Sequence, residues 1–324
     1  MGTMITQPRL SLYFLVGPTA CGKSGIALAL APRIDAEILS MDSMSVYRGM
    51  EVIAAKPTAD ARAQVPHHLI DLVEPDESFS VGRYVAEADR VAREVTARGY
   101  RPLLVGGTAL YLKTMTEGLF DGPAANPDLR RQLKVRAAAE GAPALHRALA
   151  ERDPQAAAKI HPNDLRRIVR ALEVIALTGR PISEWQQQFG SPNERYACLI
   201  IGIRRERQEL YARIDRRVDE MFERGLVEEV RALSERQPPI SPAASQALGY
   251  GELLQCFRGE LDLEEAKALI QTHTRQFAKR QLTWFRSFRN IRWIDAGPSD
   301  DAASIAERII REHYSKFEAR NPNE

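Results

Sequence analysis

A glycine-rich segment near the start of the chain has the residue types and spacing of a phosphate-binding loop. Residues 17–24 fit the pattern G-x-x-x-x-G-K-[ST], between an apolar run at 12–16 and a helical pattern at 23–30. Glycines let backbone N–H groups converge on phosphate oxygens, and the helix N-terminus also favours anions. Lys23 adds a positive charge and the Ser24 hydroxyl can bind Mg²⁺. We therefore assign binding of a phosphate, of a kind the loop does not specify, to Gly17, Pro18, Thr19, Ala20, Cys21, Gly22, Lys23 and Ser24.

Two further turns follow expected strands. Asp42 comes just after a strand expected at 36–40, and Thr108 ends a Gly-Gly-Thr turn after a strand expected at 103–105. A carboxylate beside a phosphate can hold Mg²⁺ through water or accept a proton from a nucleophile. Alternatively, Asp42 forms an Asx-turn or caps a short helix. Thr108 can donate its hydroxyl to a phosphate oxygen, and it can also cap the helix that follows.

Two basic segments could bind a polyanion. Arg166, Arg167 and Arg170 lie in a helix expected at 162–178, and near the C-terminus basic residues alternate with aromatic ones. Such mixtures suit a nucleic-acid backbone and unstacked bases. The alternative is a solvated helix face whose aromatic side chains pack in the core. The C-terminal set comprises Arg275, Lys279, Arg280, Gln281, Trp284, Phe285, Arg286, Phe288, Arg289 and Arg292.

The elements around these residues alternate between strands and helices in the first part of the chain. Helices are expected at 23–30 and 82–98 between the strands already named, which indicates a parallel sheet with ligands at the carboxyl ends of its strands. The sequence pattern over 126–190 is instead typical of helices, and the next pattern typical of a buried strand is at 196–203. We predict a core of 1–125 and 196–324 and a helical insertion at 126–195. An ordinary helical layer of one domain is the alternative. Further helices are expected at 208–235, 248–258 and 264–289.

Composition limits the classes of protein. The net charge of the 324 residues is only +2, so contact with a polyanion must come from local clusters. Three cysteines without a C-x-x-C pair argue against zinc or disulfide frameworks and suit a reducing cytoplasm. No apolar run reaches the roughly 20 residues of a membrane span, and no signal-peptide pattern is present.

Two short motifs receive little weight. Adjacent His67 and His68 on a strand would face opposite ways, which disfavours a shared metal. Residues 1–6 match the myristoylation pattern, but so short a pattern often matches by chance, and we expect an unstructured segment there.

The ordered motifs together resemble bacterial tRNA dimethylallyltransferases, also called tRNA isopentenyltransferases. The resemblance covers almost the whole chain and implies an α/β, P-loop NTPase-like (nucleotide-kinase-like) parallel sheet flanked by helices, with an all-helical insertion. It also implies a cytoplasmic monomer that uses Mg²⁺, dimethylallyl diphosphate and the anticodon stem-loop of tRNA, and that alkylates N6 of adenosine 37. The matching segments are 17–24, 42–50, 55–58, 66–71, 106–111, 161–164, 170–174, 248–250 and 278–286.

Residue roles follow from this resemblance. Asp42 would take the proton from N6, while Lys23, Ser24, Thr108 and Arg213, with Mg²⁺ on Ser24, would neutralise the departing diphosphate. The adenine would be flipped out to reach the allylic carbon. The resemblance assigns tRNA binding to Asp42, Ser43, Met44, Ser45, Thr108, Arg130, Arg166, Arg167, Ile168, Val169, Arg170, Gln246, Ala247, Leu248, Gly249, Tyr250, Gly251, Lys279, Arg280, Gln281, Trp284 and Arg286.

Four residues depart from the family pattern. Cys21 and Ser24 stand where the family usually has Ser and Thr, and both are small enough to keep the loop. Ser45 replaces a common Gln and Gln246 a frequently basic residue, which affects tRNA contacts rather than the reaction.

Three other functions compete with this one. A small-molecule kinase would require an arginine-rich lid and a Walker-B-type aspartate, and neither is clearly identified. A transferase acting on free adenine nucleotides would not need the basic insertion. A nucleotide-gated RNA-binding module would leave Asp42 and the Gly-Gly-Thr turn without a task.

Overall fold

The computed structural model describes residues 9–118, 122–185 and 195–319. Its chain divides into two compact units, residues 1–113 with 194–324 and residues 114–193. The first division falls within helix α4 (Ala109–Glu117), whereas the sequence analysis places this boundary at 125/126. The start expected to be unstructured, 1–6, lies outside the described residues. No helix in the described part of the chain is long and apolar enough to cross a membrane.

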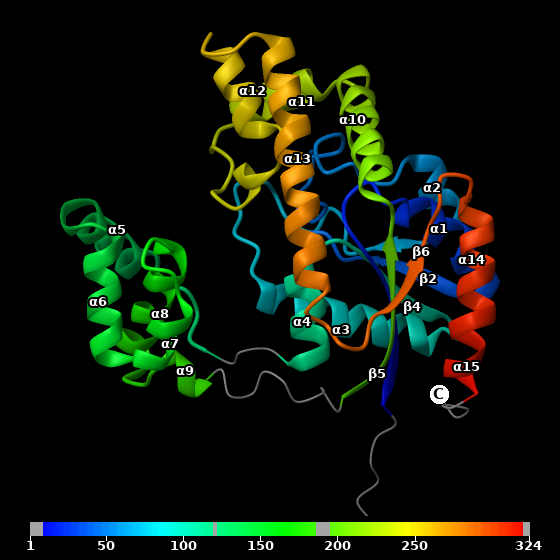
Figure 1. Cartoon of the computed structure of the whole chain (residues 1–324), viewed down its shortest axis with the longest axis horizontal. Coiled ribbons are helices and arrows are strands. Elements are labelled where there is room, and N and C mark those ends of the chain that lie inside the picture. The colour runs from blue at the N-terminus through cyan, green and yellow to red at the C-terminus, as the bar shows by residue number, and fades with distance from the viewer. Residues whose placement is uncertain (1–8, 119–121, 186–194, 320–324) are drawn as a thin grey trace, which may run out of the picture. The chain divides into compact units, whose positions relative to one another are not determined.

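The larger unit is built on a parallel sheet with the strand order β3-β2-β4-β1-β5-β6 (Figure 1). Strand β1 lies inside the sheet, where Leu15 pairs with Val105 on one side and with Ile201 on the other. Because helices cover both faces, residues 12–16 of β1 are all buried. The predicted parallel α/β sheet is confirmed. Its strands are β1 Leu10–Val16, β2 Ala36–Ser40, β3 His67–His68, β4 Arg101–Gly106, β5 Tyr196–Arg204 and β6 Arg292–Asp295.

Two of the helices that cover the sheet connect consecutive strands. Helix α1 (Lys23–Leu30) joins β1 to β2, and α3 (Val81–Ala97) joins β3 to β4. These connections run in opposite directions along the strand order, so right-handed crossovers put the two helices on opposite faces. Helix α1 packs beside α14 (Ala302–Ile309), where Ile26 and Ile305 share one apolar core with Leu15 (Figure 1).

Helices near the C-terminus build a second apolar core in the same unit. Here Leu253 of α12 and Ile270 of α13 pack with Met50, which belongs to the segment after β2. The sequence predicts one helix over 208–235, but the chain turns at Gly225, whose φ of 89° ends the first helix and begins a second. The remaining helices of this unit are α2 Ala59–Gln64, α10 Arg207–Glu223, α11 Leu226–Ser234, α12 Tyr250–Phe257, α13 Leu263–Phe285 and α15 Ser315–Glu318.

The described residues of the smaller unit form helices joined by short connections, with no strand among them. Its core contains Leu145, Leu149, Ile168 and Val174, so it buries its own apolar faces. Helices α7 and α9 were not predicted, because six or four residues are too few to display a helical period. The helices are α5 Pro127–Glu140, α6 Ala142–Arg152, α7 Pro154–Lys159, α8 Leu165–Thr178 and α9 Ile182–Trp185.

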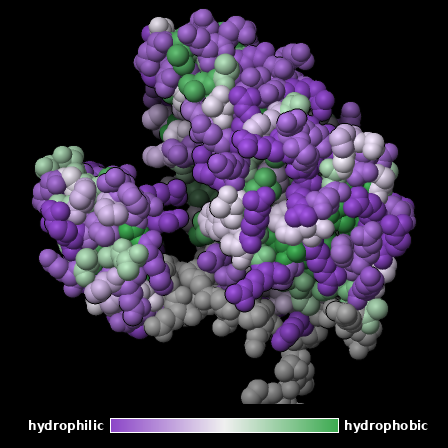
Figure 2. Space-filling model, viewed as in Figure 1, coloured by the Kyte–Doolittle hydropathy of each residue, from purple (hydrophilic) through white to green (hydrophobic). Residues whose placement is uncertain are grey.

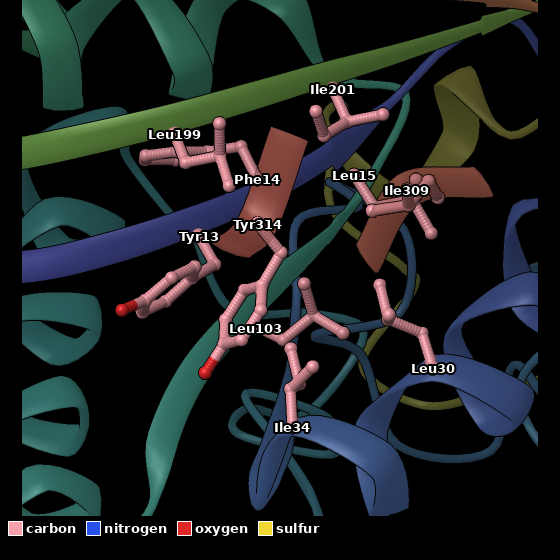
Figure 3. Close-up of a pocket in the computed structure, with 10 residues that line it drawn as sticks. All are labelled: Tyr13, Phe14, Leu15, Leu30, Ile34, Leu103, Leu199, Ile201, Ile309 and Tyr314. Atoms are coloured by element: carbon pink, nitrogen blue, oxygen red, sulfur yellow. The ribbon is translucent and has the colours of Figure 1, made fainter. Parts of the chain in front are cut away.

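A cavity in the core of the larger unit is a packing gap. Its volume is about 10 Å³, which is room for one water molecule at most. Figure 3 shows apolar side chains around it, including Leu15 of β1, Leu103 of β4 and Ile309 of α14. A space this small and apolar cannot hold a phosphate or a base. This cavity is therefore not a candidate for the functional site.

Candidate active site

Two of the predicted turns lie against each other at the carboxyl edge of the sheet. The hydroxyl oxygen of Thr108 accepts a hydrogen bond from the Ser43 N–H at 3.2 Å, and the Thr108 N–H donates to the Met41 carbonyl at 3.3 Å. A Cβ on Gly106 would lie 2.0 Å from that same carbonyl oxygen, so only glycine permits this approach. Asp42 and Thr108 are thus held on neighbouring strand ends.

Cationic side chains bind the carbonyl groups of the phosphate-binding loop. Lys23 Nζ donates to the Pro18 carbonyl at 2.8 Å, Arg213 Nε to the Ala20 carbonyl at 2.9 Å and Arg205 Nε to the Cys21 carbonyl at 2.9 Å. The first N–H groups of α1 have no partner within the helix, because an α-helix leaves its first four donors unsatisfied. The loop therefore combines the unsatisfied amide donors of the α1 N-terminus with the positive charges of Lys23 and Arg213, which suits an anion. The third cation, Arg205, is paired with Glu209.

Two arginines of α10 add positive charge to the site. Burial lowers the pKa of the Arg213 guanidinium, and the neighbouring charges of Arg205 and Arg216 lower it further. Burial also lowers the pKa of Arg217, one helical turn later, while the Asp42 carboxylate nearby acts in the opposite direction. Within the described residues, Arg217 makes no hydrogen bond or ion pair of its own. A bound anion would relieve this crowding of positive charge.

The family resemblance points to Arg213 but not to Arg205 or Arg217. Arg205 follows strand β5 directly, so the rule that pointed to Asp42 and Thr108, a polar residue after a strand, could have found it. Arg217 lies one turn after Arg213 on the same helix, and that spacing puts both on one face.

Asp42 is held by its own turn. Its Oδ1 accepts a hydrogen bond from the Met44 N–H at 2.8 Å, which is the Asx-turn that sequence analysis considered as an alternative. In the described part of the chain, its Oδ2 accepts no hydrogen bond. The turn therefore orients the carboxylate and leaves one oxygen available, so the structural and chemical interpretations are compatible.

Two stacked tyrosines lie behind Asp42. The rings of Tyr84 and Tyr111 are 3.7 Å apart between centroids and nearly parallel, and both side chains are buried. Burial raises the pKa of each phenol, and the negative charge of Asp42 raises both further. Tyr84 donates its hydroxyl hydrogen to the Ser40 carbonyl at 3.1 Å. Both phenols therefore stay protonated near the carboxylate.

Gln281 does not point outward with its basic neighbours on α13. Its Oε1 accepts a hydrogen bond from the Thr19 N–H at 2.9 Å, and its Nε2 donates to the Gly107 carbonyl at 2.9 Å. The side chain is 7% exposed. The structure thus brings Gln281 to the phosphate-binding loop, although the resemblance assigns it to tRNA binding.

The other residues assigned to tRNA in the larger unit differ in exposure. Lys279, Arg280 and Arg286 are exposed, and Trp284 keeps 42% of its surface accessible, although tryptophan is on average highly buried. The molecular face in Figure 2 is mainly hydrophilic. Gln246 and Gly251 are also exposed, Ser43, Met44 and Leu248 are half-buried, and the buried residues of the set are Ser45, Ala247, Gly249 and Tyr250.

In the smaller unit, two of the assigned arginines are occupied by a buried carboxylate. Arg130 donates to both oxygens of Glu173 at 2.8 Å, and Arg170 donates to Glu173 Oε2 at 2.6 Å. Burial pushes the pKa of Glu173 up, but the bonds from Arg130 and Arg170 outweigh it and hold the pKa below its usual value. The side chains of Ile168 and Val169 are buried in the helical core. The exposed arginines of α8 are Arg166 and Arg167.

Comparison with known sequences identifies the family. The model of the family described as IPP transferase matches residues 45–288. The chain belongs to the IPP transferase family. A tRNA dimethylallyltransferase from Geobacter sulfurreducens is 47% identical over 296 residues, covering 91% of this chain and 95% of that protein. One from Symbiobacterium thermophilum is 47% identical over 314 residues, covering 96% of this chain and 98% of its own. The resemblance drawn from the motifs is confirmed, as is the prediction of a transferase.

Solved structures agree with this IPP transferase assignment. The tRNA isopentenylpyrophosphate transferase of Bacillus halodurans is 40% identical, with a TM-score of 0.71 and coverage of 97% of this chain and 98% of that one. A eukaryotic dimethylallyltransferase described as acting on tRNA is 27% identical, with a TM-score of 0.78 over 94% of this chain and 80% of that one. The predicted P-loop-like α/β fold is confirmed.

Proposed function

We propose that this enzyme transfers the dimethylallyl group of dimethylallyl diphosphate to N6 of adenosine 37 in the anticodon stem-loop of tRNA, releasing diphosphate. The observation that carries the proposal is the position of Asp42, held by its Asx-turn beside Thr108 at the same sheet edge as the phosphate-binding loop. This edge combines an anion site with a carboxylate base, and transfer of an allylic group to an amine needs both.

The phosphate-binding loop would receive the leaving group. In the reaction the bond between the allylic carbon and the diphosphate oxygen breaks, and its electron pair leaves with the diphosphate. Lys23, Arg213 and the Thr108 hydroxyl would stabilise the negative charge that develops there. Because an adenine amine is a weak nucleophile, we expect this stabilisation and the positioning of the two substrates to supply most of the rate.

Asp42 would act on the other substrate. As the nitrogen lone pair of N6 forms the new bond to the allylic carbon, the amine becomes acidic and loses a proton to the Asp42 carboxylate. The hydrogen bond from Met44 N–H keeps one carboxylate oxygen in place, so the second oxygen is presented in a fixed orientation. The adenine would leave its stack to reach this position.

Mg²⁺ is part of the proposal. The described residues contain no cluster of three or more His, Cys, Asp or Glu side chains that could hold a metal by themselves. The exposed Ser24 hydroxyl beside a diphosphate site nevertheless fits Mg²⁺, which prefers few protein ligands, substrate phosphates and water. When bound, the ion would neutralise charge on the diphosphate.

The tRNA would contact exposed basic and aromatic side chains. On α13 and just beyond it, Lys279, Arg280 and Arg286 offer charges for the backbone and Trp284 offers a surface for stacking. Arg166 and Arg167 would contribute from the helical unit. Since the phosphate-binding loop, Asp42 and Thr108 all come from one chain, we propose a monomer, working in the cytoplasm where its substrates would be met.

Transfer of labelled dimethylallyl diphosphate tests the proposal, with bulk unmodified tRNA and free AMP as alternative acceptors. We expect label in tRNA with the wild type, and a loss of at least about a hundredfold with Asp42→Ala, since a general base contributes on this scale. Asp42→Asn is the sharper variant because its oxygen can still accept from the Met44 N–H. Label in AMP alone, or ATP hydrolysis with no label in either acceptor, would contradict the proposal.

A further inference from the structure

The Gln281 carboxamide joins two loops that follow different strands. Thr19 lies in the loop after β1, and Gly107 lies in the turn after β4. One side chain accepts from the first at 2.9 Å and donates to the second at 2.9 Å. These two loops carry Lys23 and Thr108, both of which the proposed function places at the diphosphate.

The chemistry of the two bonds selects a glutamine. One partner is an N–H donor and the other a carbonyl acceptor, so the bridging side chain must offer both an acceptor and a donor. A carboxylate cannot donate and an ammonium group cannot accept, whereas a primary amide does both at once. Gln281 is also nearly excluded from solvent, where each bond counts for more than at the surface.

Gly107 leaves the room that this bridge requires. A Cβ at that position would lie 2.4 Å from Gln281 Nε2 and 3.4 Å from the Gly17 carbonyl oxygen. Any other residue at 107 would push the amide or the phosphate-binding loop away. The bridge therefore depends on both Gly107 and Gln281, although they are far apart in the sequence.

A tRNA contact by Gln281 does not agree with this geometry. Both polar atoms of its side chain are already engaged with the protein, and the side chain is 7% exposed. Its neighbours Lys279 and Arg280 are exposed on the same helix and remain available to RNA. Gln281 thus differs from the basic and aromatic residues around it, because its side chain binds the protein itself.

We propose that Gln281 is a positioning residue that sets the spacing between the phosphate-binding loop and the Gly106–Thr108 turn, and so holds the diphosphate cradle in its binding-competent form. The inference rests on the proposed function for the identity of the anion. By linking α13 to the loop, Gln281 also connects the helix that offers Lys279 and Arg280 to tRNA with the site that holds the leaving group.

Gln281→Met tests this role, because methionine has a similar volume and no amide. Gln271→Met is the matched control, since it removes a glutamine amide from the same helix, where Gln271 Nε2 makes only a long 3.5 Å contact with Asp219. The first measurement is calorimetric binding of inorganic diphosphate with Mg²⁺ and without tRNA. We expect affinity to fall about tenfold for Gln281→Met and to stay unchanged for Gln271→Met, the scale of one to two lost hydrogen bonds.

Hydrogen exchange in the free protein supplies a readout that needs no ligand. The Thr19 amide should lose protection in Gln281→Met, while the strand before it stays protected. Gln281→Glu retains an acceptor for Thr19 but places a carboxylate oxygen against the Gly107 carbonyl, so it should bind diphosphate still more weakly than Gln281→Met. If Gln281→Met is too unstable to study, Gln281→Glu gives the same comparison of diphosphate affinity, because it still loses the bond to the Gly107 carbonyl.

The outcomes separate the two proposals. Unchanged diphosphate affinity and Thr19 protection in Gln281→Met, with a raised KM for tRNA alone, would overturn the positioning role and make Gln281 an RNA contact. A raised KM for dimethylallyl diphosphate with little change in the KM for tRNA would support it. A third outcome is that diphosphate binding depends on Gln281 but the wild type transfers no dimethylallyl group. That result would support the positioning role and contradict the proposed reaction.

Discussion

The Thr108 hydroxyl oxygen accepts a hydrogen bond from the backbone N–H next to Asp42, at 3.2 Å from Ser43 N. One side chain on the turn after β4 thus fixes the carboxylate-bearing turn after β2. The hydroxyl hydrogen remains free to point toward a phosphate oxygen, because the oxygen uses a lone pair for Ser43. Thr108 therefore contributes both to the position of Asp42 and to the charge of the leaving group.

Replacing Thr108 by valine should expose both roles. Valine keeps the branched shape but provides neither acceptor nor donor, so we expect kcat/KM for dimethylallyl transfer to fall about a hundredfold, as for loss of one donor to a developing charge. Thr108→Ser retains the hydroxyl and should keep most of the activity. Steady-state transfer to tRNA measures this, and equal rates for the valine and serine variants would contradict the assignment.

Arg213 and Arg217 should respond differently to substitution. Arg213→Lys keeps the charge but loses the Nε bond to Ala20, so it should disturb the loop, whereas Arg217→Lys should be milder. Arg217→Met removes a charge near Asp42 and should raise the KM for dimethylallyl diphosphate about tenfold. KM values at two salt concentrations measure this.

Arg216→Met is the matched control on the same helix, because that side chain is exposed and pairs only loosely with Glu220. Because its charge also acts on Arg213, we expect a small rise in the KM for dimethylallyl diphosphate, well below that of Arg217→Met. An Arg216→Met effect as large as that of Arg217→Met would indicate general loss of charge instead of a defined site.

The fold, and the meeting of the phosphate-binding loop, Asp42 and Thr108 at one sheet edge, were predictable because their signals are local. The apolar run at 12–16 and the phosphate-binding loop behind it are contiguous in sequence, and the rule that ligands bind at the carboxyl ends of parallel strands brings Asp42 and Thr108 to the same edge. Strand β6 was missed, because its four residues gain their meaning only from pairing with β5. Its pattern alone is too short to recognise.

Side-chain direction was the part that the sequence could not supply. Gln281 lies among basic residues on α13, and its composition suggests a surface, yet its partners Thr19 and Gly107 are distant in sequence. Likewise, Arg130 offers a charge whose partner, Glu173, lies on another helix. Such contacts depend on packing between elements, which one sequence does not specify.

Gly106→Ala should be unusually damaging for so small a change. The added methyl group would meet the Met41 carbonyl oxygen, a backbone atom that cannot turn aside, so we expect a loss of about 2 kcal/mol in stability. Activity should fall further, because the turn that bears Thr108 would move away from Asp42. Gly251→Ala is the stability control, since a Cβ there meets nothing within 4 Å and α12 should gain slightly. Thermal denaturation compares the two, and equal midpoints would contradict this packing.

Glu173 should make the helical unit sensitive to acid. Its folded pKa lies below the usual value, so the unfolded chain binds the proton more readily. The stability that it contributes is therefore fully present above the unfolded pKa of about 4.3, and is lost as the pH falls through the lower folded pKa. Circular dichroism melts between neutral and acidic pH measure this loss.

Glu173→Gln provides the comparison. Glutamine keeps the shape but cannot pair with Arg130 and Arg170 as an anion, so we expect a loss of about 2 kcal/mol at neutral pH and a flatter acid profile. The freed arginines should also change the KM for tRNA, with little effect on the KM for dimethylallyl diphosphate, because Glu173 belongs to the helical unit and not to the phosphate-binding loop. An acid profile identical to that of the wild type would show that other carboxylates control the transition.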